Sequence, residues 1–371
     1  MSTNEKYSRN ICVATNTSCN LNCIYCYEKR KTGKSFDVDD TLQALTSMLK
    51  ETTPYGTKIK LHGGEPFIEY GKIKFLCENL WSEELEENFK IHITTNGTLI
   101  HGEVQDWLRK HKDRLALKLS LDGDKISNDQ NRPKSYDLID IPFFVETWPD
   151  IRVNMTITPQ TIQSVDTNIK HLHSLGFNNI LVNFALLTDW SCCNKETIFY
   201  RKLLKLATFY LQNPQIRPVN LFRFDISRTI DHNGVFFSPC NIGTKTAYDL
   251  ETKKYYPCHM FFPSVCGEQM EERLSEIDFT KRDNLVSNSC KACPFLNLCR
   301  TCYADNFICR GSLCERDMSL CIYQKIVFVI LFKFEYAKIT SVDNPTSDDY
   351  QRMKAICQWS DYIDEIESQI M

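Results

Sequence analysis

Short β-branched segments alternate with longer segments whose apolar residues recur at helical spacing, from Ile11 to Leu211. The predicted strands are Ile11–Thr15, Lys58–His62, Lys90–Thr95, Leu115–Ser120, Arg152–Thr158 and Asn179–Leu186. The predicted helices between and after them are Val38–Glu51, Ile73–Glu87, Glu103–Lys112, Thr161–Leu175 and Lys195–Leu211. Strands that alternate with helices favour a parallel sheet built by right-handed crossovers. We therefore expect an α/β fold for this part of the chain.

Unusual turns follow successive predicted strands. The second strand runs into His-Gly-Gly-Glu-Pro (62–66), the third into Thr-Thr-Asn-Gly (94–97) and the fourth into Ser-Leu-Asp-Gly (120–123). Each of these alone is an ordinary turn. The carboxyl ends of the strands in a parallel barrel meet at one face, where the chemistry takes place. Together the turns predict a pocket with a glycine floor, hydroxyl groups and carboxylates.

Composition and charge restrict the cell compartment and the classes of partner that we expect. The net charge is −3 and the isoelectric point is near 6.3, so the chain shows no electrostatic footprint for nucleic acid or anionic membrane. The N-terminus lacks a signal-peptide pattern, and the longest apolar run, Ile326–Phe332, is far shorter than the roughly 20 residues that span a bilayer. We expect a cytoplasmic protein with no nucleic-acid or membrane partner. In that reducing compartment its 18 cysteines are metal ligands or catalytic thiols rather than disulfides.

The cysteines fall into two concentrations. Cys19, Cys23 and Cys26 lie just after the first strand, and ten others lie between Cys240 and Cys321. Three thiolates suit a four-iron cluster that leaves one iron open for a ligand. Paired Cys-x2-Cys units also build structural zinc sites, so a zinc-binding protein without catalytic activity is an alternative.

The run Cys19-x3-Cys23-x2-Cys26, with Tyr25 before the last cysteine, resembles the signature of the radical S-adenosylmethionine (SAM) enzymes. The three turns described above resemble the SAM-binding elements of that family, in the same order. The resemblance implies a partial (β/α)6 barrel of the TIM type. Its open iron would chelate SAM, whose reductive cleavage gives a 5′-deoxyadenosyl radical.

The same resemblance implies roles for single residues. Cys19, Cys23 and Cys26 would ligate the cluster, and Tyr25 would lie beside the adenine. Eight residues would contact SAM: Tyr25, Gly63, Gly64, Glu65, Asn96, Ser120, Asp122 and Asn154. Among them the Gly-Gly-Glu turn would hold the methionyl amino group, and Ser120 and Asp122 would reach the ribose. For Asn96 and Asn154 a second interpretation fits as well as SAM binding: each side chain would make its hydrogen bonds with neighbouring backbone groups.

The later cysteines resemble the SPASM domain, an accessory module of peptide-modifying radical enzymes that holds two auxiliary four-iron clusters. The final gap of its core pattern is two residues here rather than three, and Lys253 stands where the pattern has a glycine. The resemblance implies one auxiliary cluster on Cys290, Cys293, Cys299 and Cys321. The inner auxiliary cluster would use Cys240, Cys258 and Cys302, with Cys266, Cys309 and Cys314 in range as its fourth ligand. The expected cofactors are thus SAM and three [4Fe-4S] clusters.

Auxiliary clusters suit net oxidation, because an electron must leave when a substrate radical becomes an oxidised product. Sulfatase-maturing enzymes of this architecture carry an aspartate where this chain has His259, which argues against formylglycine formation. We expect oxidative cross-linking of side chains in a ribosomally synthesised precursor peptide, through a C–C (cyclophane) or thioether bond. A sulfatase-maturing type or another SPASM enzyme is the alternative. His259 would act as a base or donate a hydrogen bond to a cluster sulfur.

The expected organisation is a radical SAM barrel over 1–225, a SPASM module over 235–321 and a helical tail over 322–371. The tail is expected to pack on the barrel as helices Ile322–Ile339 and Asp348–Ile370, although Ile326–Phe332 also suits a buried strand. Only 18 residues precede Cys19. Either a separate protein therefore supplies leader recognition or the substrate core is bound directly. A flavodoxin or ferredoxin is the expected reductant.

Overall fold

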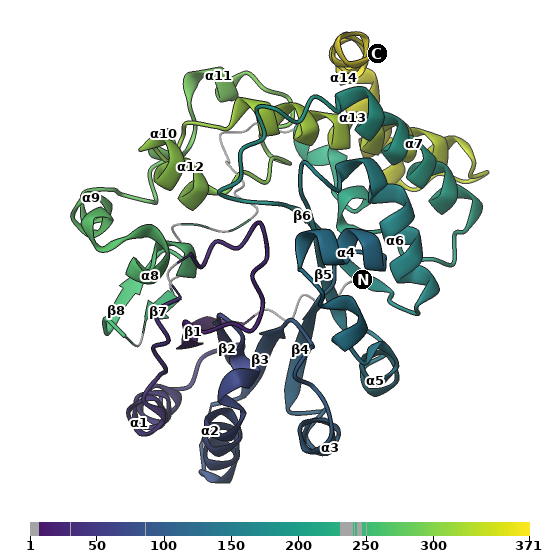
Figure 1. The fold of residues 1–371 in the computed structure, drawn as a ribbon. Coiled ribbons are helices and arrows are strands. Elements are labelled where there is room, and N and C mark those ends of the chain that lie inside the picture. Colours follow the sequence, from purple (N-terminus) through teal and green to yellow (C-terminus); the bar gives the residue numbers. More distant parts are fainter. Residues whose placement is uncertain are drawn as a thin grey trace.

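The computed structural model describes residues 7–29, 31–85, 87–230, 240, 242, 247–249 and 251–371. Its centre is a six-stranded parallel sheet whose strands follow one another in chain order (Figure 1). The strands are β1 (Arg9–Asn16), β2 (Thr57–Gly63), β3 (Phe89–Thr95), β4 (Leu115–Ser120), β5 (Arg152–Ile157) and β6 (Asn179–Phe184). In the described part of the chain β1 and β6 do not pair with each other, so the barrel is partial. This confirms the predicted α/β partial barrel.

Seven helices of the barrel region connect or follow these strands (Figure 1). They are α1 (Val38–Leu49), α2 (Tyr70–Ser82), α3 (Glu103–Lys110), α4 (Lys125–Asn131), α5 (Ile141–Thr147), α6 (Val165–Ser174) and α7 (Glu196–Gln212). Two of them, α4 and α5, were missed in the sequence because each spans only seven residues. An N-cap aspartate marks both: Asp124 accepts the Ser127 N–H at 2.8 Å, and Asp140 accepts the Phe143 N–H at 3.3 Å.

The two faces of the sheet differ in chemistry. Outward positions such as Ile59 and Leu61 of β2 are buried under the helices. The alternate positions face the barrel interior and are mostly polar or charged. On β4 and β5 they form successive levels: Ser120 pairs with Asn154 near the carboxyl ends, and Lys118 pairs with Arg152 one step below.

A second module follows the barrel and has a hydrophobic core of its own. It contains the antiparallel strands β7 (Ala247–Asp249) and β8 (Lys254–Tyr256), and the helices α8 (Pro263–Cys266), α9 (Glu271–Ser275), α10 (Arg282–Leu285), α11 (Asn288–Lys291) and α12 (Tyr303–Arg310). In Figure 1 this module is the green ribbon on the side of the barrel where β1 and β6 do not pair. Helices α1, α2 and α3 lie on the far side of the sheet. Phe261 and Phe307 are at its centre, and Cys12 of β1 joins it. Cys12 and Cys77 are both buried among apolar residues, Cys12 in this core and Cys77 in that of the barrel.

The last two helices, α13 (Met318–Thr340) and α14 (Ser347–Ile370), belong to the core of the barrel. Ile326–Phe332 is helical rather than a strand, because α13 lies against both α7 and α14 and is buried nearly all round. The Tyr323 hydroxyl donates to Glu196 of α7 at 3.0 Å. The predicted packing of the tail on the barrel is therefore confirmed. Among the described residues no helix is long and apolar enough to cross a membrane.

The boundary between barrel and second module stays a prediction, because residues 231–239 lie outside the described residues. The described residues just before this gap are not a free linker, since Val219, Phe222 and Ile226 are buried in the core that the barrel shares with α13 and α14.

Candidate active site

The first cysteine group lies in the loop after β1, and the turn after β2 supports this loop through the backbone. The Gly64 N–H donates to the Asn16 carbonyl at 3.0 Å, and the Glu65 N–H donates to the Ser18 carbonyl at 2.8 Å. The approach is so close that a Cβ on Gly64 would lie 1.9 Å from the Ser18 oxygen. Gly63 has a φ of +147°, which side chains rarely adopt. The paired glycines therefore hold the turn against the cysteine loop.

The thiols of the first group interact electrostatically with one another. Burial raises the pKa of Cys23, the nearby Arg132 lowers it, and Cys26 and Cys19 raise it further. The Arg132 Nη1 lies 3.9 Å from the Cys23 sulfur. A fixed cation at this distance favours the thiolate that metal ligation requires. The donor set therefore fits a cluster that is bound by three cysteines.

Asp122 organises the floor of this site. It is fully buried, and one carboxylate oxygen accepts from the Tyr25 hydroxyl at 2.7 Å, Arg132 Nε at 3.1 Å and Asn131 Nδ2 at 3.2 Å. The other oxygen accepts the Thr156 N–H at 2.8 Å. Both oxygens thus accept hydrogen bonds within the protein, and Asp122 orients Tyr25 and Arg132. Its predicted contact with a ribose stays a prediction. Arg132 was missed in the sequence, because it directly follows the unpredicted helix α4.

Glu65 and Asn96 join the loops that surround the site. Glu65 is 1% exposed and accepts from the Thr95 hydroxyl at 2.7 Å, the Asn96 N–H at 2.7 Å and the Phe67 N–H at 3.2 Å. Burial raises its pKa to about 7 despite these donors. The Asn96 amide reaches Asn20 of the cysteine loop at 2.9 Å. Both predicted ligand residues therefore already have partners within the protein.

Ser120 and Asn154 remain available to a ligand. They are register partners on β4 and β5, and among the described residues neither side chain has a hydrogen-bond partner. Their hydroxyl and amide groups lie side by side at the carboxyl end of the sheet. Of the predicted SAM contacts, these two side chains are the best placed for a ribose.

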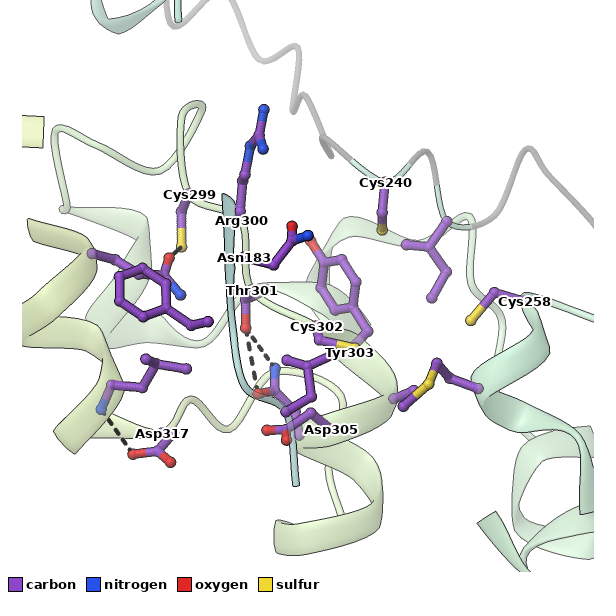
Figure 2. A pocket seen from close by; sticks show the side chains of 18 of the residues that line it. Asn183, Cys240, Cys258, Cys299, Arg300, Thr301, Cys302, Tyr303, Asp305 and Asp317 are labelled. Atoms are coloured by element: carbon purple, nitrogen blue, oxygen red, sulfur yellow. Dashed lines mark hydrogen bonds between the residues drawn. The ribbon is translucent and has the colours of Figure 1, made fainter. Parts of the chain in front are cut away.

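The second cysteine group consists of Cys240, Cys258 and Cys302. Burial raises the pKa of Cys258 to about 12 and that of Cys302 to about 11, and their thiols and that of Cys240 interact. All three line one cavity of about 490 Å³ (Figure 2). The cavity also touches Lys60 of β2 and Asn183 of β6. It therefore connects the inner face of the barrel with the second module.

The third group contains Cys290, Cys293, Cys299 and Cys321. Burial raises the pKa of Cys299 to about 11, Arg316 lowers it, and Cys321 and Cys293 raise it. Cys290 and Cys293 act on Cys321 in the same way. The structure thus brings together the four cysteines that the sequence assigned to one cluster.

Arg316 gives a second sign that this group is a cluster site. Two of its guanidinium nitrogens, Nε and Nη1, are buried without a hydrogen-bond partner in the described structure, beside Cys299 and Cys290. A buried guanidinium normally has acceptors. The sulfur atoms of an iron–sulfur cluster would supply them, so the residues present fit that group.

No His, Cys, Asp or Glu side chains in the described ranges form a group of three that could hold a single metal ion. The choice between iron–sulfur clusters and zinc at the later cysteines stays a prediction.

The fourth ligand of the inner auxiliary cluster stays a prediction. Cys309 is exposed on α12, the Cys314 sulfur contacts the Ser312 hydroxyl at 3.3 Å, and the Cys266 sulfur contacts the Phe261 carbonyl at 3.2 Å.

His259 lies beside a histidine that the sequence did not single out. Its ring centroid is 5.1 Å from that of His62 and 5.8 Å from that of Tyr27. Burial, with help from Lys60 and Lys118, lowers the pKa of His259 to about 4. Both ring nitrogens of His62 are buried without a hydrogen-bond partner in the described structure. The inward position of His62, directly before Gly63, was the signal for it.

Comparisons with known proteins agree with this geometry. Residues 13–191 match the model of the Radical SAM superfamily. Over 216 residues the chain is 24% identical to the uncharacterized protein MJ0907 of Methanocaldococcus jannaschii, which covers 54% of this chain and 72% of that protein. Over 172 residues it is 27% identical to the GTP 3′,8-cyclase of Clostridium acetobutylicum, which covers 44% of this chain and about half, 52%, of the cyclase.

Solved structures extend the likeness beyond the matched domain. Native anSMEcpe with bound AdoMet and Cp18Cys peptide has a TM-score of 0.62 at 18% identity, over 89% of this chain and 97% of that one. Streptococcus suis SuiB bound to its precursor peptide SuiA has a TM-score of 0.56 at 20% identity, over 84% and 76%. At such identities the likeness shows a shared fold. The residues that match the Radical SAM superfamily model run from within β1 to beyond β6 and include the first cysteine group, so this part of the chain is similar to that superfamily.

Proposed function

We propose that this chain is a radical SAM enzyme that oxidatively cross-links side chains of a ribosomally synthesised peptide, through a C–C or thioether bond. One observation carries the proposal. A single cavity is lined by Lys60 and Asn183 of the barrel and by Cys258 and Cys302 of the second module. A substrate held there would lie between the barrel interior, where we place the cofactor, and an electron acceptor on the second cysteine group.

The proposal assigns the first cysteine group to the SAM-binding cluster. When SAM is bound and reduced there, it supplies a 5′-deoxyadenosyl radical that abstracts a hydrogen atom. The Gly63-Gly64 turn supports the cysteine loop, and Ser120 and Asn154 would bind the ribose hydroxyls. Arg132, held by Asp122, stabilises negative charge on the thiolate of Cys23.

The second and third cysteine groups would hold two auxiliary [4Fe-4S] clusters. Their place in the chemistry is to accept the electron that leaves as the new bond forms. His259 follows Cys258 directly and is neutral at physiological pH, because its pKa is lowered to about 4. It is therefore free to accept a proton or to donate a hydrogen bond to a cluster sulfur. Cross-linking that persists in His259→Ala with full iron content would remove it from the reaction.

The expected partners are a precursor peptide and a reductant such as flavodoxin or ferredoxin, in the cytoplasm. Two proteins of this fold, anSMEcpe and SuiB, are seen with bound peptides, which supports a peptide substrate. A separate leader-binding protein or direct binding of the core peptide would complete recognition.

The test is mass spectrometry after co-expression with a short open reading frame from the gene neighbourhood. Purified, anaerobically reconstituted enzyme should also form 5′-deoxyadenosine from SAM under a strong reductant. Cross-linked peptide should be lighter by two hydrogen atoms and should not react with a hydrazide. A hydrazide-reactive product would indicate formylglycine, and an unchanged mass would indicate epimerisation. Cys19→Ala should abolish both activities, whereas Cys357→Ala, exposed on α14, should abolish neither.

A further inference from the structure

The interior of the barrel carries a layer of basic side chains that the proposed chemistry does not use. Lys118 on β4 and Arg152 on β5 are inward-facing register partners, one step below Ser120 and Asn154. Lys60 on β2 faces inward one step lower still, in register with His92 of β3 and Ala116 of β4. We call these three residues the basic layer. Lys60 also lines the cavity, and Lys60 and Lys118 both act on His259, so the layer faces the second cysteine group.

The basic layer forms no ion pair in the described structure, although Asp150, which pairs with Arg217, acts electrostatically on Arg152. Among the described residues no carboxylate lies within 4.0 Å of the amine or guanidinium groups of Lys60, Lys118 or Arg152. Like charges instead repel one another across the barrel. Burial lowers the pKa of Lys118 to about 7, and Lys58, Arg152 and Lys60 lower it further. Burial and Arg217 likewise lower the pKa of Arg152.

The acids that line the cavity are not available to the layer. Asp305 is paired with Arg310 at 2.6 Å and accepts the Leu187 N–H, and Asp317 pairs with the same arginine at 3.8 Å. At the other side of the cavity Arg300 adds a further cation, placed over the ring of Phe224. Because its acids are paired within the protein, the cavity presents mainly cations, such as Lys60 and Arg300, to a ligand.

From this arrangement we infer that the basic layer binds acidic side chains of the substrate peptide, so that the enzyme selects an Asp- or Glu-containing segment. The inference rests on the proposed peptide function and names its substrate class. A carboxylate between the layer's cations would offset their mutual repulsion in a partly desolvated site.

The spread of the charges favours a peptide over a phosphate group. Neighbouring strands lie about 4.8 Å apart, so the layer extends over roughly 15 Å from β2 to β5. An extended peptide rises about 3.3 Å per residue and presents alternate side chains to one face. Two or three acidic residues in alternation therefore match the layer. A triphosphate would instead need cations that converge on one point.

Binding of two matched probes to the SAM-loaded, cluster-containing protein tests the inference. One probe is a fluorescein-labelled peptide with aspartates alternating with serines, and the other has asparagines in their place. We expect the acidic probe to bind about tenfold tighter at low salt and to lose this advantage at high salt. Lys118→Met and Lys60→Gln should each bring the two affinities within about threefold. Lys110→Gln, exposed at the end of α3, should leave the ratio unchanged.

Three outcomes would overturn the inference. Equal binding of the two probes would mean that the layer only balances the charge of the clusters. An unchanged ratio in both Lys118→Met and Lys60→Gln would place acid recognition elsewhere. Competition by GTP, with both peptides binding weakly, would assign the layer to a nucleotide. Formation of 5′-deoxyadenosine by the same preparation separates these results from failure of the proposed function, which would abolish it.

Discussion

Replacing Gly64 by alanine should weaken the protein at the point where the cysteine loop and the β2 turn meet. The added Cβ would lie 1.9 Å from the Ser18 oxygen and 2.4 Å from the Ser18 carbonyl carbon, both of them backbone atoms. The strands must separate to relieve this overlap, which loosens the bonds from Gly64 to Asn16 and from Glu65 to Ser18. Two hydrogen bonds at about 1 kcal/mol each and overpacking of about 1–3 kcal/mol give a loss of about 3–5 kcal/mol.

The assay is urea unfolding of the iron-free protein, combined with the iron content after anaerobic reconstitution. Gly64→Ala should lower the urea midpoint and reduce the iron held by the first cysteine group, because Cys19 directly follows Ser18. Gly71→Ala is the matched control: it lies in α2 with no atom within 4 Å of the added Cβ, and should stabilise by about 0.5–1 kcal/mol. Equal midpoints and equal iron content in Gly64→Ala and wild type would refute the reasoning.

Three further predictions follow from the described contacts. Asp122→Asn leaves the Arg132 guanidinium buried without a full counter-charge, so the free energy of unfolding in urea should fall by about 3–5 kcal/mol; a loss under 1 kcal/mol would contradict this. The pKa of Lys118 is about 7 in the folded chain and about 10.4 when unfolded, so the unfolded state binds more protons between these values. Stability should therefore rise with pH over that interval, and a wild-type rise no steeper than that of Lys118→Met would show that Lys118 is not the cause. Cys293→Ala should remove about four iron atoms per chain, measured by iron assay, whereas exposed Cys309→Ala should remove none; equal losses would reject the assigned third group.

Local pattern was enough to predict most of the barrel. All six strands were expected at the observed positions, because β-branched runs bounded by turns encode strands directly. Helices α4 and α5 were not predicted, because seven residues form only about two helical turns and show no clear helical period of apolar residues. The Ile326–Phe332 run could not be assigned from its apolarity alone, and only packing between α7 and α14 made it a helix.

The candidate site was predictable as a set of residues but not as a set of roles. The cysteine spacing and the glycine turns named loops that the structure joins by hydrogen bonds. Glu65 and Asp122 were expected to contact SAM, and the structure adds partners within the protein that the sequence did not indicate, such as Asn96 and Arg132. Most of the donors that bind these buried carboxylates are distant from them in sequence. They come close only when the chain folds, so the sequence pattern does not indicate them.

The sequence by itself determined the parallel α/β fold, because that fold follows from short-range periodicity. It also predicted three groups of cysteines from their spacing. Tertiary structure alone decided that Arg132 and Arg316 face cysteine sulfurs and that His62 meets His259. It also decided that cations from β2, β4 and β5 share one interior. Each of these depends on strand register and on the closure of the second module over the barrel, where the electrostatic interactions join residues far apart in the chain.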